Sequence, residues 1–251
     1  MEVHHHPQLH HQPKPWKEYL LEYIMIVLAV TTGFFAESLR ENITEHHQEK
    51  EYIISLHEDM HENDTVLTSM IKAHEQNVWM MDTLINLLGQ FNGIKGNEAE
   101  LYYFSRIAPR VEILPLTDRT FQQLKSSGNA HVISDLNAIG RVIKYYNNDI
   151  PYIKLEEDLY MREFDQYKTT AAQIFDPTVM RSLELPDGSI KRTNGNPSLL
   201  NYDIKLFKQL AVFVVYMRGS VVGDIEREKK LQHDGQQLIK YLQEHYSYLK
   251  N

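Results

Sequence analysis

The chain has 251 residues, a formal net charge of −8 and no cysteine. This length predicts one or two domains. The acidic balance argues against a nucleic-acid partner, because phosphate contacts need a basic surface, and the lack of cysteine excludes disulfides and thiolate metal sites. Only 11 Gly and 9 Pro occur, while 42% of the residues are hydrophobic. Few turns and ample core residues indicate an all-α protein of long helices.

Residues 1–16 form a polar tail that contains five of the 13 histidines: His4, His5, His6, His10 and His11. A His-rich tract can bind metal. The simpler interpretation is a plain polar tail, and we adopt it. No metal ion or other cofactor is therefore expected.

Residues 17–40 are predicted to form a transmembrane helix. The stretch from Tyr23 to Ala36 has 14 residues without a charge, and its extension to Tyr19–Ser38 gives 20. About 20 largely apolar residues cross the hydrocarbon core of a bilayer. The near end carries aromatic residues that fit an interfacial belt: Trp16, Tyr19 and Tyr23.

Three positions inside this stretch carry specific expectations. Glu22 lies one turn inside the near end, where a carboxylate costs far less than at the bilayer centre. Ala29 and Gly33 form a small-xxx-small pair, a spacing that lets two membrane helices approach closely. The predicted anchor residues are Tyr19, Glu22, Ala29, Gly33 and Ala36.

Two other interpretations of the stretch stay open. A basic front, a short apolar run and Ala36-Glu37-Ser38 also resemble a signal peptide with its cleavage site. The front is long for a signal peptide, however, and it carries Glu18 and Glu22. A buried helix of a water-soluble protein is the third interpretation, which the polar tail before the run and the charged sequence after it argue against.

The charges beside the stretch predict its orientation. Lys14 and Lys17 precede it, whereas a single Arg40 follows and leads into Glu41 and Glu45. Because basic residues collect on the cytoplasmic side, we expect a cytoplasmic N-terminus. The chain is thus predicted to be a single-pass protein of a bacterial inner membrane, with residues 41–251 in the periplasm.

Residues 41–251 are expected to form an elongated antiparallel helical bundle outside the membrane. A single helix from Leu39 to about Leu88 is predicted to leave the membrane unbroken, because no Pro or Gly lies between Gly33 and Gly89. Its apolar residues alternate at three- and four-residue spacing, which is typical of a bundle helix. The stripe contains Ile53, Leu56, Met60, Leu67, Met70, Val78, Met81, Leu84 and Leu88, with Asn63 and His74 in two heptad-spaced positions.

The remaining elements follow from caps and breakers. Helices are predicted over Glu98–Ser105, Arg119–Ser127, Asp135–Asn147 with a Ser134 cap, and Tyr152–Phe175 after a break or kink at Pro151. An irregular or hairpin insertion is expected near 177–197, with a turn at Leu185-Pro-Asp-Gly-Ser189. Ser198 is expected to cap a last helix that runs to Leu249. Its apolar part has only nine uncharged residues between Lys208 and Arg218, so we interpret it as core and not as a second span.

One catalytic motif occurs in the chain. His57-Glu58-Asp59-Met60-His61 matches H-E-x-x-H, which in zinc proteases places two imidazoles on one helical face while the glutamate activates the metal-bound water. The usual continuation is absent, and the only nearby third ligands, His74 and Glu75, lie on the same predicted helix. We therefore interpret the motif as a solvated flank of a bundle helix. A zinc hydrolase that uses His57, Glu58 and His61 is the alternative.

Several segments resemble a family of bacterial single-span membrane proteins, catalogued as a domain of unknown function. The first is the anchor with Glu22, Ala29 and Gly33. The second is a pattern after it, formed by Glu51, Tyr52, Ile53, Leu56, Asp59, Met60 and Asn63. The third is a helix stop and restart, formed by Phe121, Leu124, Lys125, Ser126, Ser127, Gly128, Ile133, Ser134, Asp135, Tyr145 and Tyr146.

The resemblance covers much of residues 19–150 and fades beyond them. The exit from the span departs from the family pattern, because Glu37-Ser38-Leu39-Arg40-Glu41 stands where the family tends to have Asn-Asn-Trp-Asn-Glu. What the resemblance implies is an inner-membrane anchor, without an activity.

Together these features predict a non-enzymatic, membrane-anchored helical protein. We expect its partners to be the lipid bilayer and either a second copy or another envelope protein, in a scaffolding or sensory role. A small-ligand sensor with a pocket between bundle helices is not separable from this hypothesis by sequence.

Overall fold

The computed structural model describes residues 15–89, 94–110 and 115–249, without the side chains of residues 154–159. These residues form an all-α fold, as the sequence predicts. The histidines of the N-terminal tail lie outside the described residues. The chain divides into two compact units, residues 1–51 and residues 52–251.

The first unit consists of the beginning of helix α1, which spans Trp16–Gly89. The helix starts directly after Pro15, whose carbonyl accepts a hydrogen bond from the Glu18 amide at 2.8 Å. It ends at Gly89, where the sequence places a stop. The predicted continuous helix through the anchor segment and beyond it is thus confirmed.

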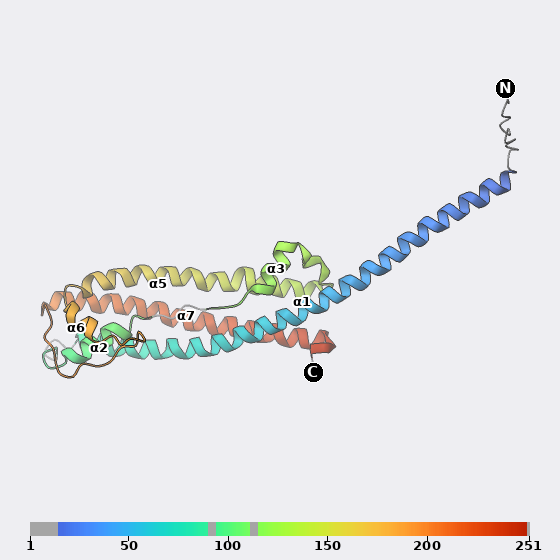
Figure 1. Ribbon diagram of the computed structural model, residues 1–251. Helices are drawn as coiled ribbons and strands as arrows, with labels where there is room; N and C mark the ends of the chain where they lie inside the picture. The colour runs from blue at the N-terminus through green and yellow to red at the C-terminus, as the bar shows by residue number, and fades with distance from the viewer. Residues whose placement is uncertain (1–14, 90–93, 111–114, 250–251) are drawn as a thin grey trace, which may run out of the picture. The chain divides into compact units, whose positions relative to one another are not determined.

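The second unit is a bundle of three long helices that lie side by side (Figure 1). They are the α1 residues from Tyr52 onward, α5 (Ile150–Ala171) and α7 (Ile204–His245). α7 runs antiparallel to the other two (Figure 1). Shorter elements cover the ends of this bundle: α2 (Glu98–Ile107), α3 (Arg119–Ser127), α4 (Leu136–Lys144) and α6 (Pro177–Ser182).

Two of the bundle helices follow an unbroken 3-4 repeat of buried residues, so they pack like a coiled coil. On α1 the buried positions are Ile53, Leu56, Met60, Asn63, Leu67, Met70, His74, Asn77, Met81, Leu84 and Leu88. The prediction of this stripe was right except at Val78, which is only half-buried, because Asn77 holds the core position. On α7 they are Phe207, Leu210, Val214, Met217, Val221, Asp224, Glu228, Leu231, Gly235, Leu238 and Leu242.

Three predicted boundaries were wrong. Asp135, not Ser134, caps α4, because its carboxylate accepts the Asn137 and Ala138 amides. Asp203, not Ser198, caps α7 in the same way. The interruption before α5 is a π-helical segment, Tyr145–Asp149, and Pro151, which has no N–H to donate, follows it in the first turn of α5.

The insertion near 177–197 is less irregular than predicted at its start, since Asp176 caps the short helix α6 there. The predicted hairpin is reduced to one antiparallel bridge between Glu184 and Ile190. Gly188 has φ +80°, the left-handed conformation that glycine adopts without strain.

Candidate functional site

The anchor segment in the first unit is a fully exposed apolar helix. Every residue from 15 to 48 is exposed, and this includes all five predicted anchor residues. Phe34 is 74% and Met25 67% exposed. Burying such side chains is the main stabilisation that water-soluble proteins obtain, so a surface of this kind needs another apolar phase or a partner.

The two threonine hydroxyls inside this segment form hydrogen bonds with backbone carbonyls of the same helix. The Thr31 hydroxyl donates to the Val27 carbonyl at 2.6 Å, and the Thr32 hydroxyl donates to the Leu28 carbonyl at 2.7 Å. Hydroxyls that bond back to their own helix need no water. These two hydroxyls therefore meet the demand of a bilayer interior that polar groups be paired.

Within the described residues, two helices are long and apolar enough to cross a membrane, α1 and α7. α7 meets this criterion because its middle is apolar on two sides. One side, from Phe207 to Val221, packs into the bundle core. The opposite side exposes a stripe, here called the α7 stripe, formed by Val212, Val215, Tyr216, Gly219 and Val222.

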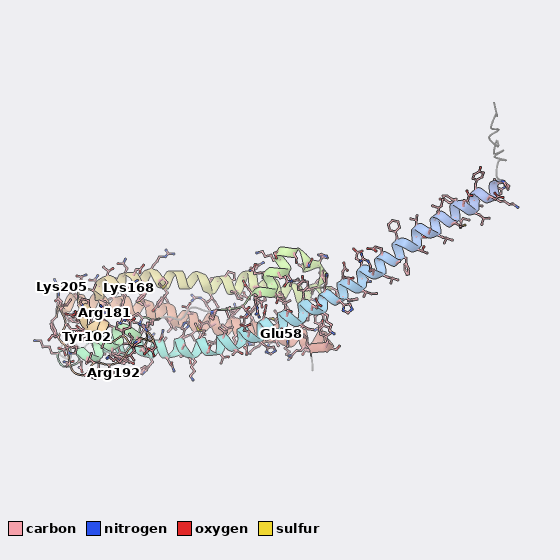
Figure 2. All side chains as sticks on the ribbon, viewed as in Figure 1. Glu58, Tyr102, Lys168, Arg181, Arg192 and Lys205 are labelled. Carbon is pink, nitrogen blue, oxygen red and sulfur yellow. The ribbon has the colours of Figure 1, made fainter. Side chains whose placement is uncertain are left out.

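The H-E-x-x-H residues lie on α1 in the second unit. Nε2 of His57 is 3.3 Å from Nε2 of His61, and the Gln243 amide nitrogen on α7 lies 3.1 Å from His57 Nε2. Partial burial, together with the neighbouring His61, lowers the pKa of His57. Glu58 is exposed and lies toward the end of the bundle opposite Tyr102 (Figure 2).

The third ligands considered for a zinc hydrolase are engaged elsewhere. His74 Nδ1 lies 2.9 Å from Glu228 Oε1. Glu75 forms an ion pair with Lys229 at 2.9 Å. Among the described residues, no group of three or more His, Cys, Asp or Glu side chains converges as a metal site. The geometry at His57 and His61 is therefore that of a two-imidazole pair, without the ligand set of a zinc protease.

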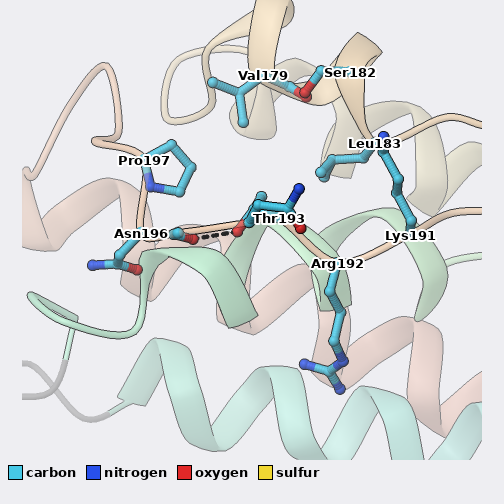
Figure 3. Close-up of a pocket in the computed structure, with 10 residues that line it drawn as sticks. Val179, Ser182, Leu183, Lys191, Arg192, Thr193, Asn196 and Pro197 are labelled. Carbon is cyan, nitrogen blue, oxygen red and sulfur yellow. Dashed lines mark hydrogen bonds between the residues drawn. The ribbon is translucent and has the colours of Figure 1, made fainter.

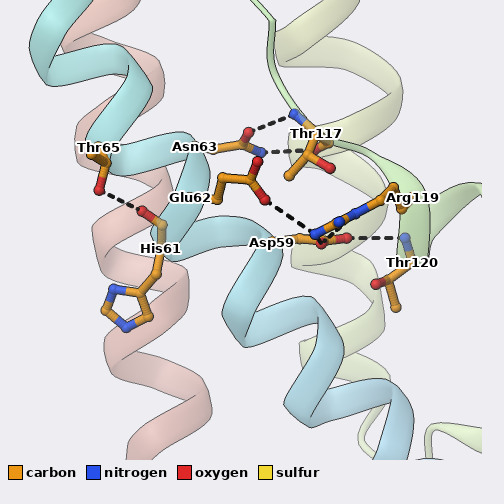
Figure 4. A network of polar contacts seen from close by, with 8 residues as sticks. All are labelled: Asp59, His61, Glu62, Asn63, Thr65, Thr117, Arg119 and Thr120. Carbon is orange, nitrogen blue, oxygen red and sulfur yellow. Dashed lines mark hydrogen bonds and ion pairs between the residues drawn. The ribbon is translucent and has the colours of Figure 1, made fainter.

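Asp59 and Asn63, on the other side of α1, form a polar network with the start of α3 (Figure 4). Asp59 accepts the Thr120 amide at 3.0 Å and an Arg119 nitrogen at 2.8 Å. Asn63 pairs with both backbone groups of Thr117, at 2.7 and 2.9 Å. Asp59 and Asn63, two of the residues on which the family resemblance rests, thus have a structural role: they hold α3 against α1.

A layer of buried polar side chains interrupts the bundle core between its two hydrophobic clusters. It contains His74 and Asn77 from α1 and Asp224 and Glu228 from α7, each at most 8% exposed. Arg227 pairs with Asp224 at 3.0 Å. Sequence analysis placed His74 in the stripe but missed the two acidic residues, which only the heptad spacing of α7 could have indicated.

A hollow with a volume of about 470 Å³ lies in the insertion (Figure 3). Lys191 and Arg192 supply its cationic groups. Arg192 is already paired with Glu100 and lies over the Tyr103 ring, 4.2 Å from its centroid. The hollow is thus part of the insertion and not the pocket between bundle helices that a sensor would use.

Comparison with protein-family models, with curated proteins and with solved structures found no match.

Proposed function

We propose that the chain is a single-span membrane protein of a bacterial inner membrane, anchored by residues 17–40. The observation that carries this proposal is the contrast in burial. Residues 15–48 expose every side chain, whereas residues 52–251 bury a regular heptad core. A sequence that builds a proper core elsewhere does not leave a run of 14 uncharged, mostly apolar residues bare in water.

The orientation belongs to the same proposal. Lys14 and Lys17 retain the N-terminus in the cytoplasm, and residues 41–251 lie in the periplasm. The resemblance to the family of single-span membrane proteins supports this assignment, and we propose that the chain is a member.

We further propose that the bundle works by binding protein and not by catalysis. The α7 stripe supports this, because Val215 is 50% and Tyr216 62% exposed on the side of α7 opposite the core. Gly219 has open space above it, so a partner helix can approach closely there. The partner is a second copy of the chain or another envelope protein.

Membrane retention tests the anchor. Full-length protein in bacterial membranes should resist carbonate extraction, whereas a Val27→Asp/Val30→Asp variant should be released, because each central carboxylate costs about 2.5–3.5 kcal/mol. Ile43→Asp, outside the apolar run, is the matched control and should be retained. Release of the unchanged protein, or a mature protein whose N-terminal residue is Leu39, would contradict the proposal.

The lack of native cysteine makes the orientation directly measurable. In intact spheroplasts, a membrane-impermeant maleimide should label Glu45→Cys at once but Lys14→Cys only after permeabilisation. The reverse pattern would overturn the orientation while leaving the anchor intact.

Crosslinking from the same cysteine-free background tests the interaction proposal. Val215→Cys in membranes should give a crosslinked product with a short bis-maleimide, whereas the exposed Glu226→Cys on α7 should give much less. A product of twice the chain mass identifies a second copy, and any other discrete mass identifies another protein. A monomer for both variants would count against the proposed surface.

A further inference from the structure

The two imidazoles of the H-E-x-x-H segment lie close together, with His57 half-buried and His61 exposed. Their ring centroids are 4.5 Å apart with planes at 77°, and the Nε2 atoms face each other at 3.3 Å. Gln243 reaches the same point from α7, 3.1 Å from His57 Nε2. The Gln243 side chain from α7 thus lies beside the imidazole pair of α1, in contact with His57.

The spacing of these atoms matches a metal coordination sphere. Two imidazole nitrogens at about 2.0–2.1 Å from a tetrahedral zinc ion lie about 3.3–3.4 Å from each other. The nitrogen and oxygen of the Gln243 amide are interchangeable by rotation, so its oxygen can occupy the position near His57.

We propose that His57, His61 and Gln243 bind one divalent transition-metal ion of the class that prefers imidazole, such as Zn²⁺, Ni²⁺ or Cu²⁺. The ion would join α1 to the end of α7, with water in the remaining positions. This site is a clamp between two helices. It differs from the zinc hydrolase hypothesis, because its third donor is Gln243 and Glu58 has no part in it.

A metal-free alternative accounts for the same geometry. One imidazole can donate its N–H to the other, with the tautomers arranged to suit. In that case the contact is a local hydrogen bond on α1, and the position of Gln243 is irrelevant to metal affinity. The Zn²⁺ affinities of variants at His61 and Gln243 separate these two outcomes.

The test uses the full chain with the tail histidines replaced by asparagine, since that tract can bind metal by itself. Zn²⁺ binding to this background is measured by competition with a chromogenic indicator. We expect one equivalent of Zn²⁺, and His61→Ala should weaken the affinity by at least about tenfold, the lower end of what even an outer partner contributes to a metal site. His233→Ala, an exposed histidine elsewhere on α7, should leave it unchanged.

Because a loss of Zn²⁺ affinity could also result from unfolding, a variant that gains affinity provides a second test. Gln243→His adds a third imidazole and should tighten Zn²⁺ binding by about tenfold or more, because imidazole is the better ligand. Gln236→His, also exposed on α7, should have no such effect. With Cu²⁺, electron paramagnetic resonance should show nitrogen coupling that His61→Ala reduces. Equal affinity in the background, His61→Ala and Gln243→His would overturn the proposal.

Discussion

His74 on α1 and Glu228 on α7 face each other inside the bundle, with His74 Nδ1 2.9 Å from Glu228 Oε1. Both occupy core positions of their heptads, and their side chains are 4% and 0% exposed. Buried polar pairs of this kind stabilise little by themselves, but they penalise every register in which the partners miss each other. We infer that this layer fixes how α1 and α7 align.

Removal of one partner of this pair should be strongly destabilising. His74→Leu leaves the Glu228 carboxylate buried opposite an apolar side chain, and we expect the free energy of unfolding to fall by about 3–5 kcal/mol. The double variant His74→Leu/Glu228→Leu should recover most of this loss. Chemical denaturation of the single and the double variant measures the effect. A double variant that is no more stable than the single variant would contradict the pairing.

Asp59→Ala should destabilise the bundle by about 2 kcal/mol, because the Thr120 amide loses its acceptor and α3 loses its dock on α1. Arg119→Ala should cost less than about 1 kcal/mol, since the Arg119 side chain is 71% exposed. Thermal unfolding of the two variants side by side gives the comparison. An equal cost for both would mean that the ion pair, and not the amide hydrogen bond, holds α3.

Two glycines of α7 should respond to alanine with opposite signs. At Gly235 an added Cβ would lie 3.2 Å from a Tyr145 ring carbon, and such overpacking costs about 1–3 kcal/mol, which outweighs the gain in helix propensity. At Gly219 the space is open, so alanine should stabilise by up to about 1 kcal/mol. Denaturation midpoints report both changes, and a stabilised Gly235→Ala would show that Tyr145 moves aside.

The cap of α4 should make stability depend on acid pH. Burial acts to raise the pKa of Asp135, but hydrogen bonds from the Tyr241 hydroxyl and from the Ala138 and Asn137 amides outweigh it and leave the pKa below its ordinary value. This contribution is complete above the unfolded-state pKa of about 3.9 and is lost as the pH falls through the lower folded-state value.

Asp135→Asn keeps an acceptor at the cap but cannot titrate, so it serves as the matched control. Between pH 6 and pH 3, the parent protein should lose more stability than Asp135→Asn, measured by urea denaturation at each pH. If the stability of the two proteins fell in parallel with pH, the Asp135 carboxylate would not contribute to the pH dependence of folding.

Local sequence signals identified the long elements correctly. A run of residues 39–88 without Pro or Gly predicted the continuous helix, and the 3-4 spacing from Ile53 to Leu88 predicted its buried side. The caps at Ser134 and Ser198 were wrong because several cap-forming residues stand close together, and only the packed path of the chain selects Asp135 and Asp203. The contact between Gln243 and His57 joins residues 186 positions apart, beyond the reach of any local pattern.

The sequence by itself determined the all-α class, the apolar segment at 17–40 and the heptad stripe of α1, because each depends on periodicity or composition along one continuous stretch. Only the tertiary structure decided which polar residues are buried together, that Asp59 and Asn63 hold α3, and that Gln243 lies against His57. Those outcomes depend on how α7 and the start of α3 align with α1, which is set by packing over the whole bundle.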